Sequence, residues 1–151
     1  MAPKLKLSVR GGTPDQHKKI KSVAHWIISH LLGKRQASFL NIFIVLSKTI
    51  DKNHYGECEI ADDNVRPREF NIYLAHDISP RILTRILAHE LIHIKQFVRN
   101  EMFDYARSEY LSRWKGKTIN IERLEYRKIP WEREALKLEG PLAKAYRAAN
   151  K

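Results

Sequence analysis

One segment constrains this chain more than any other: His89, Glu90 and His93 form an H-E-x-x-H sequence inside a stretch of helical periodicity over residues 79–100. Apolar residues recur on one broad arc of that helix, at Ile82, Leu83, Ile86, Leu87, Ile94, Phe97 and Val98. The opposite arc holds Arg81, Thr84, Arg85, Lys95, Gln96 and Arg99. His89 and His93 lie at the border of the apolar arc, where two polar rings need polar partners. One shared metal ion would supply a partner to both.

The spacing of these residues predicts their chemistry. Residues four apart on a helix differ by about 40° around its axis, so His89 and His93 project from the same side. Two imidazoles in this arrangement are typical ligands of one tetrahedral Zn²⁺. Glu90 lies about 100° from His89 and about 60° from His93, so its carboxylate can reach a zinc-bound water without being a ligand. We therefore predict one Zn²⁺ per chain and hydrolysis of a carbonyl substrate, with Glu90 as the base.

A catalytic zinc normally has three protein ligands, so a third ligand must come from elsewhere in the chain. No histidine follows His93, and Gln96 and Arg99 occupy the Gly and final His positions of the longer H-E-x-x-H-x-x-G-x-x-H pattern. The other five histidines lie upstream, where a third ligand is less usual. Downstream carboxylates are therefore favoured.

Helical projection of residues 130–139 selects among the downstream acids. The apolar arc of this segment is formed by Trp131, Ala135, Leu136 and Leu138. Glu132 falls inside the arc, whereas Glu134 lies about 160° away and is expected to be a solvated acid. Glu139 also falls within the arc and remains a weaker rival. We predict Glu132 as the third ligand, because an acid on a buried face requires compensation.

These residues resemble the gluzincins, zinc peptidases with H-E-x-x-H on one helix and a glutamate on a later helix. Residues 132–135 (Glu-Arg-Glu-Ala) look like the E-x-E-A start of the second motif in the membrane-associated and minigluzincin branches, where the first glutamate binds zinc. Residues 130–135 are also similar to small metallopeptidases inferred from bacteriophage genomes. The resemblance implies a zincin-like fold and peptide hydrolysis. In one departure, Leu136 stands where the membrane-associated branch usually has Asp; the transmembrane helices of that branch are also absent.

Periodicity and turn signals predict an α+β fold with a single zincin-like domain over residues 1–151. The expected order is a helix over 14–33, a three-stranded sheet from 39–46, 55–60 and 69–75, the helix over 79–100, and a C-terminal helix from 130 that Gly140-Pro141 interrupts. Turns are expected at 51–53 and 62–64. Between the helix over 79–100 and the C-terminal helix, we expect helical turns near 105–114 and an extended piece at 117–121.

Lys and Arg number 28 against 17 Asp and Glu, which gives a formal charge of +11. The expected partner is a peptide or protein substrate, and the basic surface permits non-specific contact with nucleic acid. Two alternatives to a simple peptidase stay open: a non-catalytic zinc-containing structural or assembly protein, and a protease that acts on DNA-bound proteins.

The chain has one cysteine, Cys58, and no segment long and apolar enough to span a bilayer. With no signal-peptide pattern in the first ten residues, these features predict a cytoplasmic protein without a membrane partner. Cys58 is expected to be a small strand residue, with an inhibitory thiolate on zinc as the minority alternative. Tyr126 is a weaker candidate for an oxyanion donor, and residues 55–60 are the candidate edge strand for aligning a substrate.

Overall fold

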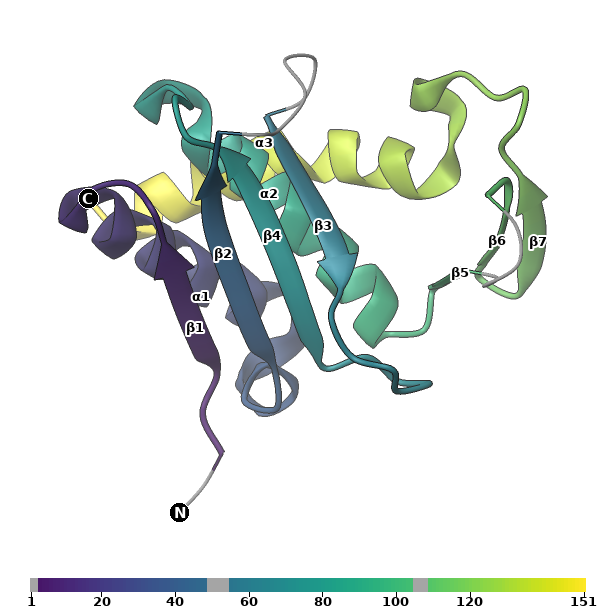
Figure 1. Ribbon diagram of the computed structural model, residues 1–151, viewed down its shortest axis with the longest axis horizontal. Helices are drawn as coiled ribbons and strands as arrows, with labels where there is room; N and C mark the ends of the chain where they lie inside the picture. The colour runs from purple at the N-terminus through teal and green to yellow at the C-terminus, as the bar shows by residue number, and fades with distance from the viewer. Residues whose placement is uncertain (1–2, 49–54, 105–108) are drawn as a thin grey trace.

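The computed structural model describes residues 3–48, 55–104 and 109–151, which form an α+β fold around a four-stranded sheet (Figure 1). The strand order is β1 (Lys6–Arg10), β2 (Asn41–Ser47), β4 (Glu69–Ala75) and β3 (Gly56–Ile60). The first three run parallel, and β3 joins β4 in the antiparallel direction at the outer edge. The predicted α+β class is confirmed.

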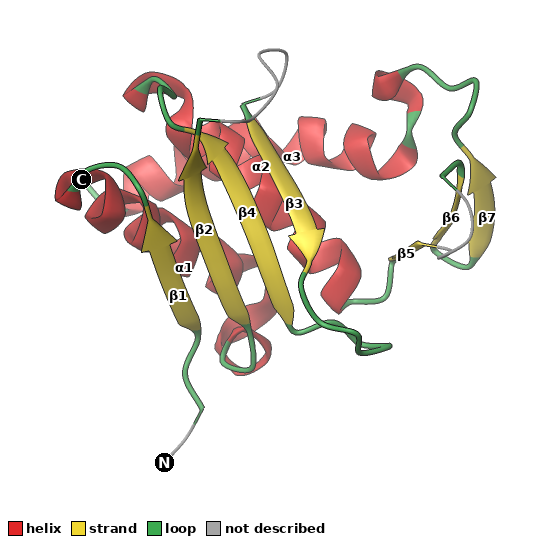
Figure 2. Ribbon diagram, viewed as in Figure 1, coloured by secondary structure: helices red, strands yellow, loops and turns green. Residues whose placement is uncertain are grey.

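The helices lie on one side of this sheet (Figure 2). They are α1 (Pro14–Ala37), α2 (Pro80–Val98) and α3 (Pro130–Ala149). Both α1 and α2 pack against strands, while α3 packs mainly against α2 and carries the C-terminal part of the chain. In the part of the chain that the structure describes, no helix has the combination of length and apolar composition needed to cross a membrane.

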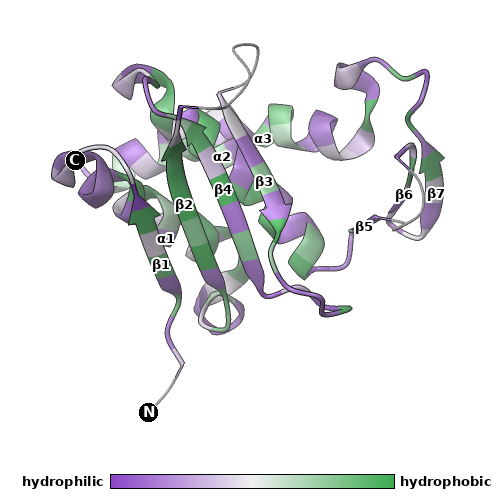
Figure 3. Ribbon diagram, viewed as in Figure 1, coloured by the Kyte–Doolittle hydropathy of each residue, from purple (hydrophilic) through white to green (hydrophobic). Residues whose placement is uncertain are grey.

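Alternating side chains form the core between sheet and helices. Ile42, Ile44 and Leu46 of β2 are buried, as are Phe70, Ile72 and Leu74 of β4, and Figure 3 shows β2 as largely hydrophobic. The two-residue period of strands places each set on the face that the helices cover. The prediction of β4 is therefore correct to the residue, because its alternation is regular.

The predicted helix starts are also confirmed. Thr13 caps α1 through a reciprocal pair of hydrogen bonds with Gln16, and Pro14 occupies the first helical position. Ser79 caps α2 through a single hydrogen bond, which its hydroxyl accepts from the Arg81 N–H, ahead of Pro80. Because α2 begins where predicted, the H-E-x-x-H segment lies in the middle of this helix, within a run from 87 to 94 in which every residue is buried.

Two predicted helix breaks differ from the structure. Gly33 interrupts α1 with φ of 82°, but the chain resumes a helical turn up to Ala37. Gly140-Pro141 does not interrupt α3, which is continuous. Proline costs one backbone hydrogen bond there, and the burial of Leu142 and Tyr146 further along the same face compensates for the loss.

The predicted sheet was too small, and the region after α2 was partly wrong. The structure adds β1 as a fourth strand; its Leu7 and Val9 pack against the core while the alternating residues stay exposed. After α2, a second sheet consists of β5 (Met102–Asp104), β6 (Leu111–Trp114) and β7 (Lys117–Asn120). The predicted helical turns at 109–114 are therefore incorrect and the extended piece at 117–121 is confirmed. The remainder of those turns, at 105–108, and the turn at 51–53 lie outside the described residues.

Candidate metal centre

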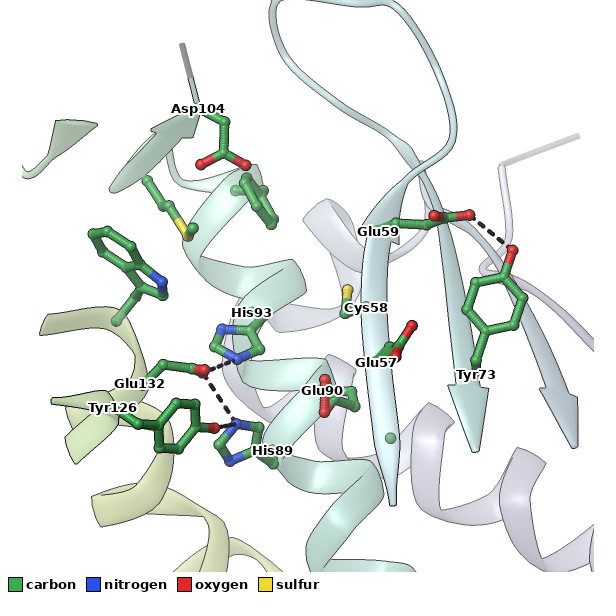
Figure 4. Close-up of a pocket in the computed structure, with 14 residues that line it drawn as sticks. Glu57, Cys58, Glu59, Tyr73, His89, Glu90, His93, Asp104, Tyr126 and Glu132 are labelled. Atoms are coloured by element: carbon green, nitrogen blue, oxygen red, sulfur yellow. Dashed lines mark hydrogen bonds and ion pairs between the residues drawn. The ribbon is translucent and has the colours of Figure 1, made fainter. Parts of the chain in front are cut away.

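Three side chains from two helices meet at one point behind the edge of the sheet. His89 and His93 lie one turn apart in the middle of α2, with ring centroids 4.9 Å apart. From α3, one carboxylate oxygen of Glu132 lies 2.5 Å from His93 Nε2 and 3.2 Å from His89 Nε2 (Figure 4). One ligand atom from each residue lies within 4.8 Å of the other two, an arrangement that can hold a metal ion. Within the described residues, no other histidine belongs to such a group.

The start of α3 determines which acid faces α2. Pro130 occupies the first helical position, and the buried side chains of Trp131 and Ala135 pack this end of α3 into the interior. Glu132 is on the same side and points to the histidines. Glu134 instead accepts hydrogen bonds from Lys95 Nζ at 3.0 Å and Gln96 Nε2 at 3.2 Å. Glu134 is therefore tied to α2 beside the site, rather than solvated as predicted.

Gln96 controls the orientation of the His93 ring. Its side chain is 0% exposed, and its amide nitrogen donates to the Trp131 carbonyl at 3.0 Å and to Glu134. The amide oxygen must then face His93 Nδ1, which lies 2.8 Å away. His93 Nδ1 therefore donates its proton to Gln96, and the lone pair of Nε2 is free to face Glu132 and a metal ion.

Glu139 serves the other histidine. One of its carboxylate oxygens lies 3.4 Å from His89 Nδ1, and the second lies 3.4 Å from Arg85 Nε. Glu139 is therefore on the far side of the His89 ring from Glu132, where it orients the ring rather than competing as a ligand. It supplies a carboxylate one turn after Leu136, the position at which the gluzincin resemblance fails.

Glu90 is the remaining acid of the segment, and it turns toward strand β3 (Figure 4). Its side chain is 5% exposed and accepts no hydrogen bond from the described residues, yet it lines the main cavity. Close approach of β3 depends on Gly56, because an added Cβ there would lie 3.2 Å from Glu90 Cγ and 3.1 Å from Ile86 Cγ2. A buried carboxylate that has no hydrogen-bond donor in the described part of the chain, next to two histidines, is suited to accept a proton from a bound molecule.

The carboxylates of the site favour positive charge between the two rings. Burial lowers the pKa of His89, but its hydrogen bonds to Glu132 and Glu139 outweigh burial and raise that pKa to about 10. His93 shows the same balance, and its pKa is also raised. Conversely, both histidines hold the pKa of Glu132 well below its usual range in spite of burial. Burial raises the pKa of Glu90, against the opposing effect of His93 and His89.

The three groups face a cleft of about 460 Å³. Gly56 and Cys58 of β3 form one wall, and Trp131 and Tyr126 form the other. A second hollow of similar size continues past Gly56, Glu90 and Tyr126 toward Tyr55 and Leu136. The two hollows together extend along the free edge of β3, as an extended polypeptide would require.

Two residues considered as minor candidates also line the cleft. The hydroxyl of Tyr126 lies 3.3 Å from His89 Nε2. Burial and the charge of Glu132 raise the pKa of Tyr126, so the hydroxyl keeps its proton and can donate. Burial, followed by the charge of Glu90, raises the pKa of Cys58 well above its usual value. These effects favour the neutral thiol of Cys58 as long as no metal ion is bound.

Gln96 was assigned from sequence to the polar, solvent-facing arc of α2, and this prediction was wrong. Thr84, assigned to the same arc, is buried as well. Helices α1 and α3 both pack against α2, so more of its surface is covered than its apolar arc indicates. The only local signal for Gln96 is its position three residues after His93, a spacing that brings two side chains together on a helix.

We expect replacement of Gln96 by Met to weaken metal binding by about 10- to 100-fold, because His93 Nδ1 loses the acceptor that orients the ring. Competition with a chromophoric chelator would measure this. Lys95→Met is the matched control: it removes a contact between α2 and α3 through Glu134 but leaves the His93 hydrogen bond intact. Equal metal affinity in wild type and Gln96→Met would show that Gln96 only links the helices.

Comparison with protein-family models, curated proteins and solved structures finds no match to this chain.

Proposed function

We propose that this chain is a zinc-dependent peptidase of the gluzincin type, with His89, His93 and Glu132 as zinc ligands. The observation that carries the proposal is the position of the Glu132 carboxylate, which lies within contact distance of both Nε2 atoms although it comes from a different helix. A set of two histidines and one glutamate, open on its fourth side to a cleft, is typical of catalytic zinc.

The donor set fits Zn²⁺ in chemistry and in scale. Ligand atoms about 2.0–2.1 Å from a tetrahedral zinc lie about 3.3 Å from one another. The distance between His89 Nε2 and Glu132 is 3.2 Å, close to this value, and that between His93 Nε2 and Glu132 is 2.5 Å. A small outward movement of Glu132 would bring the second distance into range. Imidazole with a single carboxylate favours zinc over Mg²⁺ or Ca²⁺, which prefer oxygen ligands.

Each residue around the site has a distinct part in the proposed reaction. Zinc, when bound, acts as a Lewis acid and makes water more acidic. Glu90 accepts the proton of the attacking water on its carboxylate and returns it to the amine nitrogen that leaves. Tyr126, whose hydroxyl stays protonated, donates a hydrogen bond to the carbonyl oxygen as negative charge develops on it. Gln96 and Glu139 hold the two imidazoles in place.

Strand β3 is the proposed support for the substrate. It pairs with β4 on one side only, and its other edge borders the cleft. Ala61 N–H donates to the Glu69 carbonyl and Tyr55 accepts from Ala75, so odd-numbered residues of β3 bond to β4. The backbone groups of Cys58 therefore point to the free edge, where an antiparallel peptide could pair with them.

Cys58→Pro is expected to raise KM for a peptide by about tenfold while zinc remains bound, because it removes one N–H that faces the substrate and no bond to β4. Steady-state kinetics and metal content would test this. Val9→Pro is the control: it removes an outward-facing N–H from β1, at the far edge of the same sheet. Unchanged kinetics in Cys58→Pro would argue against pairing along β3.

The proposed function is tested first on the wild-type chain purified without added metal. Native mass spectrometry is expected to show one zinc ion per chain, and a mixed peptide library should be cleaved. A strong chelator should abolish cleavage, and stoichiometric zinc should restore it. A chain that carries no metal and takes none up on titration with zinc would refute the proposal.

A further inference from the structure

A third hollow lies at the C-terminal end of α2, away from its capped start. It has a volume of about 490 Å³ and is lined by Gln36, Arg66, Arg68, Val98, Arg99 and Asn100. These residues come from the end of α1, the segment before β4 and the end of α2. Three arginines and two amides thus meet from three separate parts of the chain, and each of the five can donate hydrogen bonds.

The three arginines are free to bind an anion. In the described part of the chain, none of them forms an ion pair. Arg99 donates through one nitrogen to the Leu31 carbonyl at 3.0 Å, and Arg68 donates to the Pro67 carbonyl at 2.8 Å. These bonds orient two guanidinium groups yet leave most of their N–H donors unused. A guanidinium held in this way loses little entropy when it binds a phosphate.

Asp62, the acid in the neighbouring loop, is engaged through one carboxylate oxygen, Oδ2, whereas Oδ1 is buried without a hydrogen-bond partner among the described residues. Asp62 accepts the backbone N–H of Arg68 and the amide of Asn64, both at 2.9 Å, through the same oxygen. It lines a different hollow, with Asp63. The arginine hollow itself contains no carboxylate.

Basic residues continue beyond the hollow along this end of the sheet. Lys34 and Arg35 occupy the last turn of α1. The Arg68 carbonyl accepts from Asn41, and Asn41 pairs with Lys6 on β1. Figure 1 shows the starts of β1, β2 and β4 together with the end of α1 at this end of the molecule. Lys6, Lys34 and Arg35 thus add positive charge to this end of the sheet, where the exposed Glu69 also pairs with Asn41.

We infer that this arginine hollow binds the phosphate backbone of nucleic acid. An extended row of phosphates matches several basic groups at once, and the planar guanidinium of arginine can bind two oxygens of one phosphate. A membrane surface is a poorer fit, because an interfacial protein inserts a set of apolar side chains. Val98, the one apolar residue among those that line the hollow, is buried, and Val65 beside Arg66 is exposed but is a single small side chain. The sequence contains no base-reading motif, so the binding is independent of base sequence.

The hollow is close to the metal centre along α2. Arg99 follows His93 by six residues, which corresponds to about 9 Å along a helix axis. An intermediate hollow shares Phe97 and Met102 with the main cleft and Asn100 with the arginine hollow. Nucleic acid in the arginine hollow would hold proteins bound to it at high local concentration beside the cleft. This consequence rests on the proposed peptidase function, whereas the binding itself does not.

The test is the salt dependence of binding to short labelled duplex and single-stranded DNA, followed by fluorescence anisotropy on the full chain. For duplex DNA, the variant Arg66→Gln/Arg68→Gln/Arg99→Gln is expected to bind at least about tenfold more weakly at low salt, and its log–log salt slope should fall by about three. Lys21→Gln/Lys144→Gln/Arg147→Gln is the matched control. It removes the same charge from exposed positions on α1 and α3 and should change the slope by less than about one.

The single variant Arg66→Gln shows whether weaker binding could come from misfolding of the triple variant. Arg66 makes no hydrogen bond within the described residues, so its replacement should leave the fold intact. It is expected to reduce the slope by about one. Equal weakening in both triple variants would reduce the effect to net charge and overturn the inference. So would a lack of DNA binding by the wild type at low salt. Binding to phosphatidylserine vesicles but not to DNA, lost in the arginine variant, would assign the hollow to a membrane instead.

Discussion

Glu90→Gln is expected to lower kcat/KM for peptide hydrolysis by about 10²- to 10⁴-fold while one zinc ion stays bound to each chain. Glutamine has nearly the same size and shape as glutamate, so the packing of α2 against Gly56 is preserved. It has no negative charge, however, and it cannot take the proton of the attacking water. Because Glu90 is not among the three grouped ligands, the metal should remain. Measurement of both kinetics and metal content on the same preparation tests the expected loss of activity and the expected retention of zinc.

The control for this variant is Glu122→Gln, an exposed acid in the loop after β7. It should hydrolyse peptide at the wild-type rate. If wild type and Glu90→Gln contain zinc but behave alike with every peptide tested, the chain is a zinc-containing protein without catalysis, the structural or assembly alternative. If Glu90→Gln loses its zinc, Glu90 is a ligand and the proposed division of roles is wrong.

Glu132→Ala is expected to weaken zinc binding by about a hundredfold or more. Zinc sites with four ligands are worth about 10–16 kcal/mol at neutral pH, so one ligand contributes roughly 3 kcal/mol. His93→Ala should lose still more, since it removes a ligand and also leaves the buried Gln96 amide oxygen without its partner. Zinc content after dialysis against a weak chelator would measure both.

Glu134→Ala is the matched control, two residues away on the same helix. It removes one of the two carboxylate partners of Lys95 and one of the two acceptors of the Gln96 amide. Lys95 keeps its ion pair with Glu101, and Gln96 stays bonded to the Trp131 carbonyl. Zinc content should therefore be retained. If Glu134→Ala loses zinc and Glu132→Ala retains it, then Glu134 is the third ligand and Glu132 is not.

Metal binding also provides a readout that is independent of activity. A ligand that binds only the folded state at a concentration 1,000 times its Kd stabilises that state by about 4 kcal/mol. The melting temperature of the wild type should therefore rise on addition of zinc, and that of Glu132→Ala should rise much less. If no peptide is cleaved, this comparison distinguishes a chain that does not bind zinc from one that binds zinc but was tested without its substrate.

Local periodicity was enough to predict much of this protein. The start of α2, the range of β4 and the common face of His89 and His93 depend on the repeat of helix or strand and on adjacent capping residues. The same reasoning favoured Glu132 over Glu134 as the inward-facing acid. Neighbours in sequence determine such features, because the position of a side chain on a helix depends only on its place in the repeat.

The remaining features depend on segments that are far apart in the chain. Gln96 is buried because α3 covers a polar part of α2, and Glu139 reaches His89 because α3 continues through Pro141. Strand β1 needs β2 as a partner, and the arginine hollow exists only where the ends of α1 and α2 meet the start of β4. The residues that could bind a metal, and the helix face on which they lie, follow from local sequence patterns. The groups that orient these residues are apparent only in the folded chain, since burial and hydrogen bonding belong to pairs of segments and not to either one alone.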